Sequence, residues 1–503
     1  MEKTKLHKTA HDLTVGSPAK KILLFSLPLI LTNVLQVLFS MSDLAVVGRF
    51  STNGAEAIGA IGSTTIYVAL FTGILIGIGS GINALTARHL GAENDVKVSK
   101  ISHTGFLVSL IFGLIIFGLG AGLARPILQL LKTKDEFIDD AAIYIYIYFS
   151  GLPGLAVYNY GNGVLSADGD TKRPLIFLAS AGVLNIGLNL LFVIPCAMSV
   201  VGVAVASVIS QYVSAVLTVI SLGATKRPYR LHIKQLKLGA SETKEILALG
   251  LPAGLQNAIF SAANLFIQAG VNTFDAKMVE GNSVAANADN FVYNVMSAFY
   301  MACSSFVAQN YGAGKHKNIL KCYLICVAYS FGIAAVLGVI FVLCGRPFLS
   351  IFTSDAEVIE GGMKRLSIMG YSFGLSAFMD ATISASRGMG KTLIPTIIVI
   401  LGSCVFRIVW VYTVFAHYKT ISSLYLLYTV SWSITSIAEI AYFVYIYTRK
   451  VKRAAASETT QEAVAPPQDA VEAVETAECC ASTEATDIIE DKISGGDYEQ
   501  TTD

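Results

Sequence analysis

Long apolar runs separated by short polar connectors follow one another from Ile22 to Tyr447. Each run holds roughly 20 residues, which allows a helix to cross ~30 Å of hydrocarbon. We count twelve runs, so the pattern predicts an all-α polytopic membrane protein with twelve transmembrane helices. The expected spans are 22–49, 57–85, 102–124, 141–165, 174–195, 199–222, 244–271, 284–310, 321–344, 363–386, 394–416 and 421–447.

The composition agrees with a bilayer environment, because 54% of the 503 residues are apolar and only 14% are charged. The first 21 residues are polar and the first apolar run leads straight into the second, which argues against a cleavable signal peptide. With the N-terminus in the cytoplasm, the inside segments hold 25 Lys and Arg residues and the outside segments nine. This excess predicts a multi-pass protein of the cell (plasma or inner) membrane with both termini cytoplasmic.

The C-terminal segment has a different character from the rest. Residues 454–503 carry thirteen Asp and Glu residues and one Lys, whereas the whole chain has a net charge of +1. An acidic segment with few large apolar residues cannot bury enough surface to fold alone. We therefore expect 449–503 to be a solvated, disordered cytoplasmic tail.

The apolar part of the chain repeats itself at an interval of 221 residues. The segment "RPILQLLKTKDEFID" at Arg125 returns as "RPFLSIFTSDAEVIE" at Arg346, and Gly169, Thr171 and Pro174 return as Gly390, Thr392 and Pro395. Each half holds six helices, so both halves enter the membrane from the same side and should be related by a pseudo-twofold axis along the membrane normal. Paired bundles of this kind are typical of alternating-access carriers, whose substrate path lies at the repeat interface.

The repeat defines the expected organisation of the chain. Residues 1–21 form a cytoplasmic tail, 22–222 an N-lobe of six helices, 223–242 a basic cytoplasmic linker and 243–448 a C-lobe of six helices, followed by the acidic tail. The two six-helix lobes are the predicted domains.

The stretch "ASRGMGKT" at 385–392 falls one residue short of the nucleotide-binding pattern G-x-x-x-x-G-K-[ST], because Ala385 stands at the first glycine. Its twin in the first half is a turn between two helices with no such pattern, and a true phosphate loop follows a strand. The glycines at 388 and 390 are better explained by a helix end and a tight turn. We expect no nucleotide and no nucleic acid as a partner.

Four ionisable residues stand out within the expected spans: Asp43, Asp289, Asp380 and Arg407. A charge at membrane depth costs about 2.5–3.5 kcal/mol or more, so each is a candidate functional group. Asp43 shares its expected depth with Asn185 and Asn189 on the fifth span and Ser207 on the sixth. These oxygens suit Na⁺, with Asp43, Asn185 and Asn189 as the candidate metal ligands, and the carboxylate alone suits a proton. The alternative is that the amides bond between helices while Asp43 faces the outside water.

In the C-lobe, Asp289 and Asp380 are candidates for a second ion site or for a counter-charge to a cationic substrate. Arg407, near the middle of the eleventh span, is the expected partner of one of them. A purely structural ion pair is an equally good explanation. No arrangement typical of a hydrolase, a metal site or a disulfide framework is found, so we predict neither an enzyme nor a cofactor.

Several segments together resemble the multidrug and toxic compound extrusion (MATE) family. They are "LPLILTNVLQVLFSMSDLAVVGRF", "ADGDTKRP", "GNSVAANADNFVYNVMSAFY" leading into "AQNYGAG", and "SRGMGKTLIPTIIVILGSCVFRIVW". The resemblance runs from about residue 20 to 448 and is closer to the DinF-like than to the NorM-like branch. It implies two six-helix lobes, a central cleft, and export of organic, often cationic compounds against inflowing H⁺ or Na⁺.

The resemblance also implies an N-lobe cation site made of a first-helix Asp, an Asn-x-x-x-Asp pair on the fifth helix and a sixth-helix hydroxyl. Here the pair is Asn185 and Asn189, so the second acid is missing. The seventh-helix carboxylate of the NorM-like branch is also missing, since no Asp or Glu occurs between Ile246 and Phe274.

We therefore predict a monomeric secondary antiporter in the lipid bilayer that exports small organic molecules in exchange for H⁺ or Na⁺ by alternating access of the two lobes. The nearest alternative is a lipid-linked saccharide flippase, which would favour a cleft rich in Arg and Lys. An intramembrane enzyme would need a nucleophile or metal constellation, and a channel would show continuous conductance.

Overall fold

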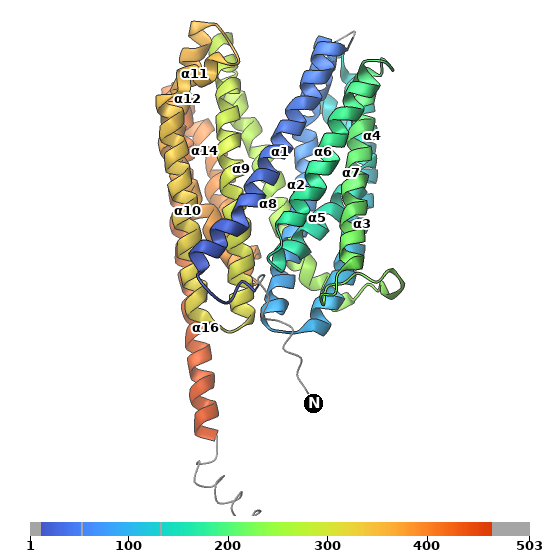
Figure 1. Ribbon diagram of the computed structural model, residues 1–503. Helices are drawn as coiled ribbons and strands as arrows, with labels where there is room; N and C mark the ends of the chain where they lie inside the picture. The colour runs from blue at the N-terminus through green and yellow to red at the C-terminus, as the bar shows by residue number, and fades with distance from the viewer. Residues whose placement is uncertain (1–11, 52–53, 131–132, 465–503) are drawn as a thin grey trace, which may run out of the picture. The chain divides into compact units, whose positions relative to one another are not determined.

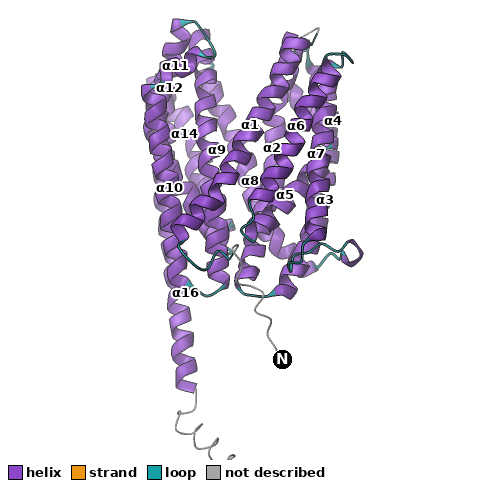
Figure 2. Cartoon of the chain, in the orientation of Figure 1, coloured by secondary structure: helices purple, strands orange, loops and turns teal. Residues whose placement is uncertain are grey.

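The computed structural model describes residues 12–51, 54–130 and 133–464, and all regular secondary structure within these ranges is helical (Figures 1 and 2). The chain divides into two compact units, Met1–Phe443 and Val444–Asp503. The first unit holds nearly all of the helices. The long helices are α1 (Pro18–Phe50), α2 (Gly54–Gly91), α3 (Asp95–Leu130), α4 (Ile138–Ser150), α5 (Leu152–Ala167), α6 (Lys172–Val193), α7 (Ser199–Ala224), α8 (Ala240–Val271), α9 (Ala276–Gly312), α10 (His316–Leu343), α12 (Ala356–Gly388) and α16 (Ile421–Val464).

Ten segments of the described chain are helical, long and apolar enough to cross a membrane, and the bent pair α4 and α5 makes an eleventh. The remaining expected span is α12, whose 33 residues suffice in length although it carries several charges. The span expected at 141–165 is present as a bent pair of helices, because the chain turns by 46° between α4 and α5. A side chain at Gly151 would meet Gln211 at 2.3 Å, and Pro153 lacks an N–H for a continuous helix.

The span expected at 394–416 is not a uniform α-helix. It consists of α13 (Leu393–Val399), the π-helix η2 (Ile400–Val405), α14 (Phe406–Trp410), the π-helix η3 (Val411–Phe415) and α15 (Ala416–Tyr418). Wide π turns are rare and occur often at functional sites. Arg407 lies on the short α-helical segment between them.

The two halves of the chain share local structural features at positions 221 residues apart, as the predicted duplication requires. Gly169 and Gly390, 221 residues apart, both adopt left-handed backbone conformations, with φ of +91° and +78°. The Arg125–Asp139 ion pair has a counterpart at the same interval in Arg346–Glu360, and both pairs measure 2.7 Å. Helix α12 ends at Gly388, so "ASRGMGKT" is a helix end and turn, as predicted.

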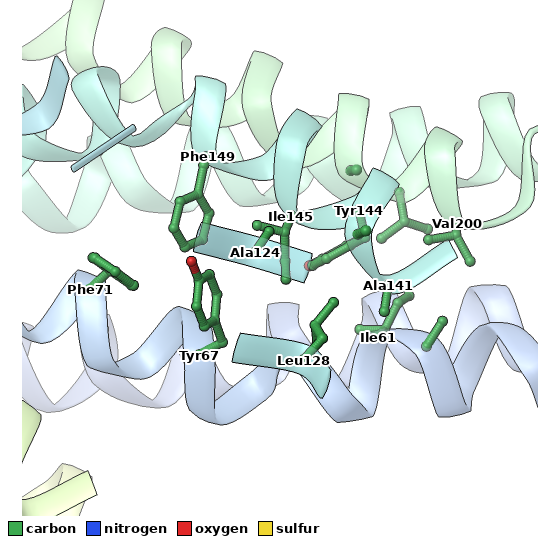
Figure 3. Close-up of a cluster of buried hydrophobic side chains, with 14 of the residues drawn as sticks. Ile61, Tyr67, Phe71, Ala124, Leu128, Ala141, Tyr144, Ile145, Phe149 and Val200 are labelled. Atoms are coloured by element: carbon green, nitrogen blue, oxygen red, sulfur yellow. The ribbon is translucent and has the colours of Figure 1, made fainter. Parts of the chain in front are cut away.

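One apolar cluster of the N-lobe has the side chains that are labelled in Figure 3 on α2, α3, α4 and α7. Tyr67 stacks on Phe149 with ring centroids 5.3 Å apart, and its hydroxyl donates to the carbonyl of Gly120 at 2.5 Å. The hydroxyl thus keeps a partner although the ring is buried. This cluster fixes α4, which carries Tyr144 and Tyr148 toward the polar site described below.

The linker expected at 223–242 is anchored to the N-lobe. The Tyr229 hydroxyl donates to Asp168 at 3.0 Å, and Ser102 donates to the Tyr229 carbonyl at 2.8 Å. Burial, with Asp168 alongside, raises the pKa of Tyr229 well above its usual range. Tyr229 therefore stays a hydrogen-bond donor at physiological pH.

The two halves meet through backbone contact between α2 and α8. A side-chain carbon at Gly77 would lie 2.2 Å from the Gly254 nitrogen, and one at Gly81 would lie 2.6 Å from the Gly250 nitrogen. Helix α1 adds a polar contact, since Asn33 donates to the Asn294 carbonyl at 2.9 Å. The ribbons of α1 and α9 diverge from there toward the upper end of the view (Figure 1).

Helix α16 continues to Val464, so the first part of the expected acidic tail is helical rather than disordered. The remainder of that tail, 465–503, and residues 1–11 of the expected N-terminal tail lie outside the described residues.

Replacing Gly77 by Ala should lower the free energy of unfolding by about 1–3 kcal/mol, because the added carbon strikes the backbone of α8 and cannot be absorbed by a side-chain rotation. The measurement is equilibrium unfolding by denaturing detergent in mixed micelles. Gly118→Ala on α3 is the matched control, since nothing lies within 4 Å of the added carbon. Equal stability of the two variants would contradict the close α2–α8 packing.

Candidate functional site

The structure brings together the four N-lobe residues that the sequence singles out. Asn189 donates to Asp43 Oδ1 at 2.5 Å and to Asn185 Oδ1 at 3.2 Å. Ser207 donates to Asp43 Oδ2 at 3.4 Å and accepts from the Asn185 amide at 3.5 Å. The four side chains form a closed hydrogen-bonded ring, which we call the Asp43 ring.

Three helices hold this ring, with Asp43 on α1, the two amides on α6 and the hydroxyl on α7. Asn185 and Asn189 are four residues apart and therefore lie on one face of α6. Gly182, one turn earlier, lets α1 approach, because a side-chain carbon there would lie 1.9 Å from the Phe39 ring. Asn189 is fully buried, whereas Asp43 is half-buried.

The hydrogen bonds within the Asp43 ring do not use all of its oxygen acceptors. The side-chain oxygen of Asn189 is buried and has no hydrogen-bond partner in the part of the chain that the structure describes. Tyr144 and Tyr148 on α4 lie within electrostatic range of the Asp43 carboxylate. A carboxylate, two amide oxygens and a hydroxyl at one point offer oxygen ligands to Na⁺, and the carboxylate alone can accept a proton.

Asp289 is paired, but its partner is Arg365 rather than Arg407. Arg365 donates to Asp289 Oδ2 from Nε at 2.8 Å and from a terminal nitrogen at 2.5 Å, and also to Asn282 at 2.6 Å. Tyr425 shares the Asn282 oxygen at 2.9 Å. Arg365 is the third residue of the span expected at 363–386, and charged residues are common at the ends of membrane spans. The sequence therefore gives no signal for this pair.

Arg407 makes no ion pair with a described residue, so the expectation that it neutralises Asp289 or Asp380 at close range is wrong. It is 3% exposed, and its Nε donates to Ser431 at 3.3 Å. Its guanidinium lies over the ring of Tyr428 at 4.5 Å, and the rings of Phe260 and Trp432 lie within 6 Å. Aromatic faces stabilise a desolvated cation, which explains why a carboxylate is not required at contact distance.

Asp380 lies near a second acid, Glu439, which is not among the residues predicted from the sequence. Glu439 on α16 is fully buried, and it lies within electrostatic range of Asp380 and Arg387 on α12. Glu439 stands well inside the span expected at 421–447, so the same rule that selects Asp380 would have found it.

Helices α1 and α9 carry exposed or half-buried polar residues at helical spacing. They are Asn33, Gln36 and Ser40 on α1 and Asn287, Asn290, Asn294 and Ser297 on α9. The two rows meet where Asn33 donates to the Asn294 carbonyl and to Ser297 Oγ at 2.8 Å. Lipid-facing positions favour apolar side chains, so the rows are typical of surfaces that meet water. We call them the inter-lobe polar rows.

The comparisons with known proteins agree on one family. The family model described as MatE matches residues 28–191 and 252–413, one segment in each half. The chain is 29% identical over 396 residues to the "Probable multidrug resistance protein YpnP" of Bacillus subtilis, covering 77% of this chain and 87% of the relative. It is 23% identical over 357 residues to the "FAD transporter" of Shewanella oneidensis, covering 70% and 78%.

Solved structures show the same fold. One, described as "Reverse polarity of binding pocket suggests different function of a MOP superfamily transporter from Pyrococcus furiosus Vc1 (DSM3638)", has a TM-score of 0.81 at 21% identity over 88% of this chain and 98% of its own. A second, of a multidrug resistance MATE family transporter in an outward-facing conformation, has a TM-score of 0.80 at 21% identity over 88% and 99%. The predicted two lobes of six helices are confirmed as the fold, whereas the DinF-like branch stays a prediction.

Replacing Arg365 by Met should destabilise the protein by about 3–5 kcal/mol, because Asp289 would be left buried without its partner. The matched control is Arg346→Met, which breaks an exposed ion pair and should change the stability by less than about 1 kcal/mol. Detergent unfolding in mixed micelles measures both. A similar small loss in the two variants would show that Asp289 is not held in its place by Arg365.

Proposed function

Because the chain belongs to the MatE family of transporters and is a multi-pass membrane protein rather than an enzyme, we propose that it is a secondary active antiporter. It exports organic, often cationic, compounds in exchange for inflowing H⁺ or Na⁺ by alternating access of the two lobes. The relatives named as multidrug resistance proteins support this substrate class. No cofactor is needed for this activity.

The Asp43 ring is the observation that carries the proposal. Asp43 accepts hydrogen bonds from Asn189 and Ser207 while it is ionised. A proton on Asp43 would remove one acceptor site, and Na⁺ would compete with the amide donor for the same oxygens. Either ion would therefore reorganise the contacts between α1, α6 and α7. Binding of H⁺ or Na⁺ to the Asp43 ring would thereby change the relative stability of different tilts of these helices.

The membrane potential supplies enough free energy to drive the proposed export. One monovalent cation that moves down a membrane potential of ~150 mV releases roughly 3.5 kcal/mol. A tenfold concentration ratio requires about 1.4 kcal/mol, so one cation can sustain a substrate gradient of about 300-fold. ATP is not required.

The inter-lobe polar rows are the proposed substrate path. They lie between the segments that we assign to the N-lobe (22–222) and the C-lobe (243–448), and one row comes from each lobe. In the orientation that we propose, both termini are cytoplasmic, in the plasma or inner membrane, and the α2–α8 contact closes the cytoplasmic side. We propose that a single chain is the functional unit.

A second candidate is the export of compounds with an anionic group, including a lipid-linked saccharide. Arg407 favours it, because this buried guanidinium has no carboxylate at contact distance among the described residues. The similarity to a protein named "FAD transporter" points to the same chemistry. Arg365 does not add to this argument, since Asp289 already neutralises it.

Replacing Asp43 by Asn should abolish ion-coupled efflux, with at least about a tenfold loss of gradient-driven rate, because the ring loses its only carboxylate. The measurement is substrate movement in proteoliposomes under separately imposed H⁺ and Na⁺ gradients, with a cationic and an anionic probe compound. Asp139→Asn, an exposed acid of the same lobe, is the matched control and should transport normally.

The ion whose gradient drives the native protein identifies the coupling ion, and the transported probe identifies the substrate charge. Native coupling in Asp43→Asn would remove the Asp43 ring from the mechanism. Efflux that responds to neither gradient would end the antiport proposal, and continuous conductance would indicate a channel.

A further inference from the structure

Glu439 is a buried carboxyl group without hydrogen bonds. The residue is fully buried on α16, and neither of its carboxyl oxygens has a hydrogen-bond partner among the described residues. An ionised carboxylate withdrawn from water without a donor is strongly unfavourable, whereas a protonated carboxyl loses far less solvation energy. The surroundings of Glu439 therefore suit a neutral side chain.

The packing of α16 against α12 places Glu439 level with Asp380. Ser436 donates to the Leu375 carbonyl at 3.1 Å, which fixes the register at one level. Further along both helices, the Tyr323 hydroxyl meets Thr382 at 2.9 Å while its ring packs on Phe443 at 4.4 Å. Asp380 and Glu439 lie between these two levels on helices that run in the same direction.

The charged groups around this pair come from several elements. Asp380 and Arg387 of α12 lie within electrostatic range of Glu439. Tyr293 and Tyr300 of α9 and Arg407 of α14 lie within electrostatic range of Asp380. Asp380 therefore has two arginines nearby, whereas Glu439 has one arginine and a second carboxylate. Two carboxylates within electrostatic range of one another disfavour each other's ionisation.

Arg387 connects this pair with the other half of the molecule. Its terminal nitrogen donates to Ser80 on α2 at 2.9 Å, while its Nε is buried and no described residue accepts a hydrogen bond from it. Helix α2 belongs to the N-terminal repeat and α12 to the C-terminal one. The hydrogen bond therefore joins the repeats near the glycine contact of α2 and α8.

We propose that Glu439 is a proton-binding residue, paired with Asp380, whose ionisation draws Arg387 away from Ser80 and weakens the contact between α2 and α12. With the proton on Glu439, Arg387 keeps its hydrogen bond to Ser80, as the structure shows it. Loss of that proton creates a buried carboxylate whose available cationic partner is Arg387. The exchange is a proton transfer between Glu439 and water, with no other group changed.

This inference deepens the proposed antiport, since it adds a proton site in the C-terminal half to the Asp43 ring. It does not depend on the Asp43 ring, because the Glu439 proton can be observed without any transported substrate. A transporter coupled only through Asp43 would leave Glu439 without a pH response.

The test is infrared difference spectroscopy on the full-length protein in lipid, recorded between alkaline and acidic buffer without substrate. A protonated buried carboxyl gives a C=O stretching band that is separate from the bands of carboxylates. We expect Glu439→Gln to lose one component of this band and Glu439→Asp to shift it. Glu360→Gln, an exposed acid of α12, is the matched control and should retain the native band.

A second measurement tests whether the ionisation of Glu439 weakens the contact between α2 and α12. Spin labels at the exposed positions Val96 and Leu393, in a background without the eight native cysteines, report the separation of the segments that follow α2 and α12. We expect this distance to change with pH in the native background and to stay at its acidic value in Glu439→Gln. Ser80→Ala should keep the infrared band but lose the pH-dependent distance. An unchanged band in both Glu439 variants, or a native distance response in Glu439→Gln, would overturn the proposal.

Discussion

The exclusion of water from the interior of the helix bundle decides how each charged group is arranged. An ion inside a membrane protein persists where other groups replace its hydration. Asp289 receives two donor groups of Arg365, and Arg407 lies among aromatic faces. Asp43 has amide and hydroxyl donors, whereas Glu439 receives no hydrogen bond from any described residue. The ion pair of Arg365 with Asp289 and the aromatic surroundings of Arg407 stabilise the fold. In the mechanism that we propose, Asp43 and Glu439 are the groups at which a small ion changes the energy of a conformation.

The duplication explains why the two halves share a backbone but differ in chemistry. Gly169 and Gly390 preserve the same left-handed turn, because only glycine adopts it without strain. Asp43, in contrast, corresponds to Asn264, which is exposed on α8. The backbone of a repeat is constrained by packing in both copies, whereas an ion site needs to be built only once. The C-terminal half carries its acids on α9, α12 and α16 instead.

Much of the architecture could be predicted from the sequence, because apolar runs of membrane length and a 221-residue repeat are one-dimensional signals. The proximity of Asp43, Asn185, Asn189 and Ser207 was also predictable, since all four fall at similar depth on consecutive helices. The role of these residues in coupling stays a prediction. The pairing of Asp289 with Arg365 could not be predicted, because it depends on a contact between helices that are distant in the chain. The bend at Gly151 has a local signal in Pro153, whereas its contact with Gln211 depends on packing.

The backbone contact between α2 and α8 has a mechanical consequence. Side chains that interdigitate must disengage before two helices can move, which creates a barrier. At Gly77 and Gly254 no side chains interlock, so the two surfaces are smooth at their point of closest approach. In the alternating access that we propose, such a place is suited to act as a fulcrum, about which one bundle would tilt against the other while the helices themselves remain intact.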